Sequence, residues 1–273
     1  MSGDQWKAAV DSDRPSVARV YDYFLGGSHN FAADRALAEQ IIAVLPEMPM
    51  IARANRSFLH RAVRFLVDAG LDQFLDLGSG IPTVGNVHDV AQRASPRARV
   101  AYVDIDPVAV AHAGILLADN DRATAVRADL RRPDQVLDHP DTQALLDFDR
   151  PVALLMVAVL HFVGDPDDPA GLVARYLAAV PSGSYLVLSH ASTDGRTPVG
   201  LSQARDLTGR TASEMTTRSY RQIADLLTGL DPVEPGLVRL PLWRPDPADA
   251  HQAGEARSAA ETFPGYAAVA RKP

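Results

Sequence analysis

The stretch QFLDLGSGIPT, from Gln73 to Thr83, places an acid and two glycines after a short apolar run. Gly78, Ser79 and Gly80 would form a turn at the carboxyl end of a strand, where open α/β sheets bind their ligands. Glycine lets the backbone approach a ligand closely and adopt positive φ angles. Asp76, just before the turn, could orient the turn's amides or attract a cationic ligand. The pattern therefore predicts a ligand-binding loop.

The spacing of the glycines separates two classes of ligand. A dinucleotide-binding fingerprint needs a third glycine at the sixth position, for close helix–strand packing and contact with a pyrophosphate. Counted from Gly78, that position is Thr83, and Pro82 lies inside the turn. The alternative is an adenosyl ligand without phosphates, such as S-adenosylmethionine (SAM), whose binding loop follows an acid. The sequence favours this second class.

A second acid ends the next expected strand, in RVAYVDIDP. Asp104 is placed where a carboxylate accepts hydrogen bonds from ribose hydroxyls, and Ile105 follows it in the same ligand-binding loop. Asp106 is expected to cap the following helix, with Pro107 at its first position.

A third acid follows the third expected strand, in ATAVRADLRRPD. Asp129 could accept a hydrogen bond from the exocyclic amine of adenine, and Leu130 could pack on the ring or offer its amide. Asp129 could instead be a plain turn residue ahead of Arg131. Acids at three successive strand ends support the adenosyl interpretation.

The run PVALLMVAVLHFVGD is the most hydrophobic in the chain and is typical of a central parallel strand buried on both faces. Val157, near its end, would line the cofactor site. His161 could act as a general base, since imidazole accepts protons near neutral pH. The interpretation that we favour is a histidine packed at the strand end, and the same alternatives apply to His190.

Short apolar runs alternate with helical patterns after Gly70, which predicts βαβ units and a mostly parallel sheet with helices on both faces. The last two strands have no helix between them, which indicates an antiparallel end. The seven expected strands are 73–77, 99–104, 123–127, 152–157, 184–189, 237–240 and 266–270. Helices are expected at about 84–94, 107–118, 170–180 and 213–228.

The N-terminal part reads as a flexible segment, residues 1–15, followed by a helical cap over residues 16–69. Apolar spacing predicts cap helices at about 16–25, 33–45 and 51–69. The first of these helices and its exit carry a polar and aromatic cluster, which consists of Arg19, Tyr21, Asp22, Tyr23, Gly26, Gly27, His29 and Asn30. This cluster could be surface capping, with Arg19 and Asp22 as a plain helix pair. In a cofactor-binding protein the cap could instead cover the site.

Several cap residues could then take part in binding or chemistry. Tyr21 and Tyr23 could stabilise a sulfonium through their ring faces. Arg56 could grip a carboxylate bidentately, or could be a solvated helix-face charge. Tyr23, His29 and His161 are weak candidates for a catalytic base.

Together, the motifs DLGSG, Asp104, ADL at 128–130 and the LHF strand end resemble class I SAM-dependent methyltransferases. The segments ARVYDYFLGGSHNFAADRALAE and ARANRSFLHRAVRFL resemble a bacterial S-adenosyl methyltransferase family catalogued as a domain of unknown function. The resemblance implies SAM as cofactor and a Rossmann-like domain over residues 70–273 that forms one unit with the cap. The fourth strand lacks an Asn/Asp-Pro-Pro-Tyr motif, which weakens a role in base or amide methylation.

The amino-acid composition limits the kinds of binding partner that this protein could have. A net charge of −7 argues against a dedicated nucleic-acid binder, and the absence of cysteine excludes thiolate metal sites, so no metal is expected. The sequence has no signal-peptide pattern and no apolar run of about 18 residues, so we expect a cytoplasmic protein.

Two hypotheses follow from these features. The first is a SAM-dependent methyltransferase acting on a small molecule, and the second is a non-catalytic SAM-binding regulatory or partner protein. A third, an NAD-dependent short-chain enzyme, is set aside because no Tyr-x-x-x-Lys pair is present.

Overall fold

The computed structural model describes residues 11–82, 85–194, 206, 209, 211, 214–246 and 262–273. Its centre is an eight-stranded sheet with the order β3-β2-β1-β4-β5-β8-β6, and β7 also pairs with β8. Strand order reverses between β1 and β4, which is where ligands bind in open α/β sheets. Five strands are parallel: β1 (Gln73–Leu77), β2 (Arg99–Asp104), β3 (Ala123–Arg127), β4 (Ala153–Val157) and β5 (Tyr185–Ala191).

The antiparallel end of the sheet is confirmed, with one more strand than the sequence analysis expected. β8 (Gly265–Arg271) runs antiparallel to β5, to β6 (Asp231–Pro232) and to β7 (Val238–Arg239). The extra strand, β6, has two residues and ends in a proline, which is too short to produce an alternating pattern. The expected strand 237–240 shrinks to β7 because its last residue begins a 3₁₀ turn, η4 (Leu240–Leu242).

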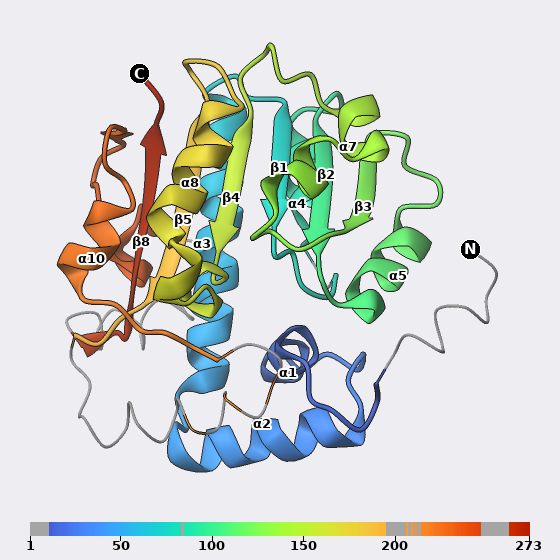
Figure 1. Ribbon diagram of the computed structural model, residues 1–273, viewed down its shortest axis with the longest axis vertical. Helices are drawn as coiled ribbons and strands as arrows, with labels where there is room; N and C mark the ends of the chain where they lie inside the picture. Colours follow the sequence, from blue (N-terminus) through green and yellow to red (C-terminus); the bar gives the residue numbers. More distant parts are fainter. Residues whose placement is uncertain are drawn as a thin grey trace.

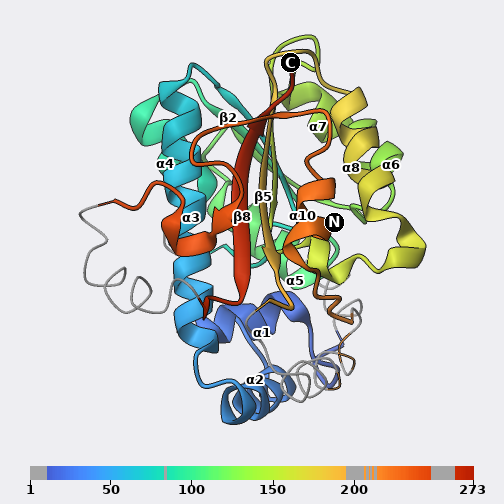
Figure 2. The same cartoon turned by 90° about the vertical axis from the view of Figure 1, so that its left-hand side faces the viewer.

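Helices cover both faces of the sheet (Figure 2). One apolar core joins the sheet to α3 (Met48–Asp68), α4 (Val87–Ala94) and α5 (Pro107–Leu116). The other core joins it to α6 (Pro133–Leu137), α8 (Pro169–Ala178) and α10 (Tyr220–Asp225). Strands β1 and β4 lie between the two cores, as expected for central parallel strands.

The short helices depart most from the expected elements. The helix expected at 213–228 is α10 alone, and position 213 lies outside the described residues. Neither α6 nor α7 (Pro140–Leu145) was predicted from the sequence; each is less than two turns long and begins with a proline. Two 3₁₀ turns, η2 (Leu160–Phe162) and η3 (Asp165–Asp167), follow β4.

The first two helices, α1 (Val17–Phe24) and α2 (Ala32–Val44), lie beyond the carboxyl ends of the parallel strands (Figure 1). They share a small apolar core that includes Phe24, Ile41 and, from α3, Ala52. Further along, α3 contributes Phe58 and Leu66 to a core under the sheet. The third expected cap helix therefore belongs to both layers and joins the cap to the sheet. Among the described residues, no helix is both long and apolar enough to cross a membrane.

Candidate functional site

The turn after β1 is held against the end of β2. The N–H groups of Gly78 and Ser79 both donate to the carbonyl of Val103, at 2.8 and 3.0 Å. The N–H of Gly80 donates to a carboxylate oxygen of Asp104 at 2.7 Å. Both glycines have positive φ, 72° at Gly78 and 67° at Gly80, as the sequence analysis expected of such a turn. The loops after β1 and β2 thus form one hydrogen-bonded unit.

The two glycines allow a matched test of this geometry. A Cβ at Gly78 would lie 2.2 Å from Cγ2 of Val159 at the end of β4, whereas a Cβ at Gly80 meets nothing within 4 Å. Both Gly→Ala changes add backbone strain of about 1–2 kcal/mol, and only Gly78→Ala adds overpacking of about 1–3 kcal/mol. We expect urea denaturation to show a larger loss in the free energy of unfolding for Gly78→Ala than for Gly80→Ala. Equal losses would contradict the close approach of Val159 to the backbone of Gly78.

Asp104 is buried and links three backbone segments. Besides Gly80, it accepts a hydrogen bond from the N–H of Asp106 at 2.8 Å. Burial raises the pKa of Asp104 to about 6, although the N–H donors of Asp106 and Gly80 act in the opposite direction. Ile105, next to it, leaves 56% of its surface exposed. The predicted cap is confirmed, since Asp106 accepts from the N–H of Val108 at 2.7 Å.

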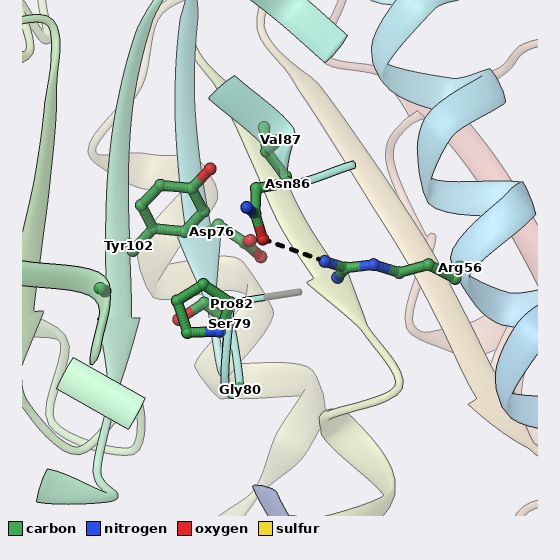
Figure 3. Close-up of a pocket in the computed structure, with 9 residues that line it drawn as sticks. Arg56, Asp76, Ser79, Gly80, Pro82, Asn86, Val87 and Tyr102 are labelled. Atoms are coloured by element: carbon green, nitrogen blue, oxygen red, sulfur yellow. Dashed lines mark hydrogen bonds between the residues drawn. The ribbon is translucent and has the colours of Figure 1, made fainter. Parts of the chain in front are cut away.

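Asp76 lies beneath the glycine turn beside a cavity of about 10 Å³, enough for one water molecule (Figure 3). Burial raises the pKa of Asp76 to about 7, the charge of Arg56 lowers it and the charge of Asp104 raises it. The carboxyl group is therefore poised to change charge near neutral pH. The cavity is lined by Arg56, Asp76, Ser79, Gly80, Pro82, Asn86, Val87, Tyr102 and Ala113.

Arg56 reaches from α3 towards Asn86 and Asp76 (Figure 3). Its Nη2 donates to Oδ1 of Asn86, the N-cap residue of α4, at 3.3 Å. The structure thus brings Arg56 to the glycine turn, whose first glycine, Gly78, lies 22 residues further along the sequence. Its expected role in gripping a carboxylate remains a prediction.

Asp129 adopts the turn role that the sequence analysis held open. Its Oδ1 accepts from the N–H of Arg131 at 2.9 Å, and its Oδ2 pairs with Nη2 of Arg131 at 2.7 Å. Burial raises the pKa of Asp129, but its hydrogen bonds and proximity to Arg131 outweigh burial and leave it lowered. Contact of Asp129 with adenine remains a prediction, as does contact of the half-buried Leu130.

A buried polar chain holds the end of β4, just beyond Val157. Ala158 has a φ of 55°, and its N–H donates to the hydroxyl of Ser189 at 2.9 Å. That hydroxyl donates to Oδ1 of Asn55 at 2.6 Å, and Nδ2 of Asn55 donates to the hydroxyl of Tyr21 at 3.0 Å. Tyr21 of the cap is thus connected to the end of β4. The role of Ser189 was not predicted, because its partner Asn55 is 134 residues away in the sequence and leaves no local pattern.

His161 is packed at the strand end, the interpretation that the sequence analysis favoured. Its ring lies against those of Phe162 and His190, at 4.4 and 5.6 Å between centroids. Burial holds its pKa well below the usual value, and the nearby His190 and Arg218 lower it further. The guanidinium of Arg218 contacts Nε2 of His190 at 2.9 Å. Burial likewise lowers the pKa of His190, to about 4.

The two other candidate bases have partners within or beside the cap. The Tyr23 hydroxyl donates to the carboxylate of Glu39 on α2. The exposed His29 lies against His112 of α5, with 4.1 Å between ring centroids. Across the described part of the chain, no group of three or more His, Asp or Glu residues could hold a metal ion.

A sheet of this order, with a glycine turn after β1 and a buried acid ending β2, has the class I methyltransferase architecture. The family model described as S-adenosyl methyltransferase matches residues 3–273, and the chain belongs to this family. Its members use SAM, so the protein is a SAM-dependent methyltransferase with SAM as its cofactor.

Two solved structures resemble this chain over almost its whole length. A proposed methyltransferase from Thermobifida fusca YX is 40% identical, with a TM-score of 0.86 over 96% of both chains. A DUF574 family protein from Streptomyces avermitilis is 39% identical, with a TM-score of 0.89 over 96% of this chain and 99% of that one. A plantazolicin methyltransferase, 11% identical with a TM-score of 0.51, shares the fold over 94% of this chain and 96% of its own. No protein of curated function matches the chain.

The residues at the loops fit an adenosyl sulfonium. Two buried acids, Asp76 and Asp104, stand beside a turn whose glycines admit close approach of a ligand. A cationic ligand stabilises ionised acids, whereas a pyrophosphate would be repelled by them. The exposed Ile105 offers an apolar surface to a planar base.

Proposed function

We propose that SAM binds across the ends of β1 and β2 and that its methyl group goes to a small-molecule acceptor at the end of β4. The observation that carries this placement is the Asp104 carboxylate, which holds the Gly80 amide and so joins the two loops. The ribose hydroxyls would donate to Asp104. Adenine would pack on Ile105, with Asp129 and Leu130 at its edge.

The methionine end of SAM carries both charges of an amino acid. Asp76 would attract its cationic groups, and Arg56 would meet its carboxylate. The opposite charges already influence each other across the cavity, since Arg56 lowers the pKa of Asp76. Val157 and the Gly78–Gly80 turn would bound this end of the ligand.

SAM supplies a methyl group on a sulfonium when it is bound, and the protein contributes mainly by holding donor and acceptor in line. Such positioning can contribute roughly 7–11 kcal/mol of barrier reduction. The chain from Ala158 through Ser189 and Asn55 to Tyr21 fixes the end of β4, where the acceptor would lie. This is the positioning that we assign to the protein.

The site supports an acceptor atom that is nucleophilic without a strong protein base. Protonating His161 would place a buried imidazolium beside the Arg218 guanidinium, and its pKa is accordingly low. Tyr23 is engaged with Glu39. We therefore expect methylation of a group that reacts in its neutral-pH form.

The cap supports a small acceptor over a macromolecule. Its Ala18 and Phe31 pack against Ile81 and Val108, so it contacts the loops after both β1 and β2. Tyr21 of the cap is also connected to the end of β4 through Asn55 and Ser189, and we expect cap helices so placed to limit the access of a nucleic acid or protein. The net charge of −7 also disfavours nucleic acid.

The test has a binding arm and a transfer arm. Calorimetry on the purified protein should show binding of SAM and S-adenosylhomocysteine and no binding of NAD. Incubation with methyl-labelled SAM and a cell extract should then place the label in the low-molecular-mass fraction, with heat-inactivated protein as the control. Label in the protein or nucleic-acid fraction would contradict a small-molecule acceptor.

A further inference from the structure

Arg19, on α1, is almost completely buried and has acceptors on three sides. Its Nε donates to Oδ2 of Asp34 on α2 at 2.8 Å. Its Nη1 lies 3.4 Å from Oδ2 of Asp106, and its Nη2 donates to the carbonyls of Asp11 and Arg14 at 3.2 and 2.6 Å. The sequence-based interpretation of Arg19 and Asp22 as a helix pair is therefore wrong, because these four acceptors occupy the guanidinium of Arg19.

Asp106 connects this arginine to the proposed ribose acid. One of its oxygens caps α5, and the other receives Arg19 and the hydroxyl of Ser16. The N–H of Asp106 donates to Asp104, whose second oxygen holds Gly80. A continuous chain of contacts thus runs from the cap through Asp106 and Asp104 to the glycine turn.

A second, apolar contact follows the same route. Ala18 of α1 and Phe31, the N-cap residue of α2, pack against Ile81, Val108 and Ala109. Ile81 directly follows the glycine turn, and Val108 and Ala109 form the start of α5. The cap therefore rests on the loops that follow both β1 and β2, through charge and through packing.

We propose that Arg19 is a positioning residue for cofactor binding, which couples the order of α1 and α2 to the affinity for SAM. The inference rests on the proposed placement of the ribose at Asp104. Arg19 touches neither Asp104 nor Gly80 in the structure, and it acts by fixing Asp106, whose backbone and side chain set the loop after β2. Because coupling of this kind is reciprocal, the bound cofactor must also order the cap.

Two variants interrupt the chain of contacts at different points. Arg19→Met keeps an unbranched buried side chain and removes all donors. Asp106→Asn keeps an effective cap for α5, because Asn caps as well as Asp does, and removes the charge that faces Arg19. Each should weaken binding of S-adenosylhomocysteine by about 5- to 150-fold in calorimetry. The double variant should lose no more affinity for S-adenosylhomocysteine than the single variant that binds it more weakly, because both substitutions break the same contact between Arg19 and Asp106.

The matched control is Arg35→Met. Arg35 is an exposed arginine of the same cap, and its Nη1 donates to the carbonyl of Asn30 at 2.8 Å, within the cap alone. Its variant should bind as tightly as the wild type. Wild-type affinity in Asp106→Asn, or an equal loss in Arg35→Met, would overturn the coupling.

Hydrogen exchange on the wild-type protein tests the reciprocal effect without any substitution. S-adenosylhomocysteine should slow exchange in α1, for example at the Val20 N–H, which donates to the carbonyl of Ser16 at 2.9 Å. The slowing should be smaller in Asp106→Asn, which retains the Arg19–Asp34 pair and so remains informative if Arg19→Met does not fold. A purely local role of Arg19 in folding the cap predicts no ligand effect on α1, and that result would overturn the proposal.

Asp104→Ala separates this inference from the placement on which it rests. If Asp104→Ala binds S-adenosylhomocysteine like the wild type, the ribose placement is wrong, and the coupling proposal falls with it. If Asp104→Ala loses binding while Arg19→Met and Asp106→Asn retain it, the placement stands and the coupling alone is wrong.

Discussion

Replacing Asp104 with alanine is expected to weaken SAM binding by at least about 100-fold. Two ribose hydroxyls donating to one carboxylate contribute about 1.5–3 kcal/mol each, and each 1.4 kcal/mol corresponds to tenfold in affinity. The substitution also frees the N–H of Gly80, which Asp104 holds at 2.7 Å, so the glycine turn loses its anchor on β2. Calorimetry with SAM measures the loss directly.

Asparagine should not rescue this position. Both carboxylate oxygens of Asp104 accept from backbone N–H groups, those of Gly80 and Asp106. An amide has one oxygen, so its NH₂ group would face one of these donors. We therefore expect Asp104→Asn to bind SAM weakly as well, despite its similar size.

The control for both variants is Asp121→Ala, in the turn before β3, whose side chain is 87% exposed. Its affinity should match that of the wild type. If Asp104→Ala binds within about threefold of the wild type, less than 1 kcal/mol, the ribose role is refuted.

The central sheet could be predicted because its strands read as short apolar runs, which in β1 and β4 are buried on both faces. The bounds of β1, β2 and β3 agree with the sequence to the residue. β6 and α6 could not be predicted in the same way. β6 has only two residues, and α6 is a helix of five residues, less than two turns, so neither shows a repeating apolar pattern, and their conformation depends on packing against the sheet.

The candidate site was predictable where its residues follow strand ends and not where they pair over long distances. Asp76, Gly80 and Asp104 come together because parallel strands bring their carboxyl ends to one edge. The partners of Asn55 and Arg19 lie up to 134 and 87 residues away. Helix periodicity could suggest that Arg19 pairs locally with Asp22, whereas tertiary packing turns it towards α5.

The cap and the loops that follow β1 and β2 bury residues of each other. Without α5 and Ile81, Arg19 would lose its contact with Asp106, and Phe31 would lose its apolar partners outside the cap. Conversely, the N-cap acid Asp106 would be more exposed without the cap, since Ser16 and Arg19 cover its second oxygen. The cap and the loops after β1 and β2 share these buried contacts, so we expect a truncation before α3 to disturb the loops as well as the cap.

Asp76→Asn is expected to stabilise the ligand-free protein at alkaline pH and to weaken SAM binding. Burial raises the pKa of Asp76 from its ordinary value of 3.8 to about 7. Between these values the folded protein holds a proton on Asp76 that the unfolded chain has lost, so the contribution of Asp76 to the free energy of unfolding falls as pH rises and levels off above about 7. From pH 5 to pH 8 this amounts to about 3 kcal/mol, at 1.36 kcal/mol per pKa unit.

The asparagine variant removes this contribution, because its side chain never ionises. Between pH 6 and pH 8 the free energy of unfolding of Asp76→Asn, taken relative to that of the wild type, should rise by about 1.4 kcal/mol. Asp104 and the buried histidines titrate in both proteins, so their contributions cancel in this difference. Urea denaturation at pH 5, 6, 7 and 8 measures the two slopes. Asp121→Asn, at an exposed position, should retain the slope of the wild type.

As pH rises, the affinity for SAM should change in the direction opposite to the contribution of Asp76 to the free energy of unfolding. A cationic ligand binds the ionised form of Asp76 more tightly, so the wild-type affinity should rise with pH through about 7 and then level off, whereas that of Asp76→Asn should not rise in this range. Binding of S-adenosylhomocysteine, which lacks the sulfonium charge, should depend less on Asp76, so the variant should discriminate less between the two ligands. Calorimetry of both ligands at pH 6 and pH 8 tests this. One ionisation, that of Asp76, is expected both to strengthen binding of the cation and to destabilise the empty site. If the SAM affinities of the wild type and of Asp76→Asn changed in parallel with pH, Asp76 would not titrate in this range, and both expectations would be wrong.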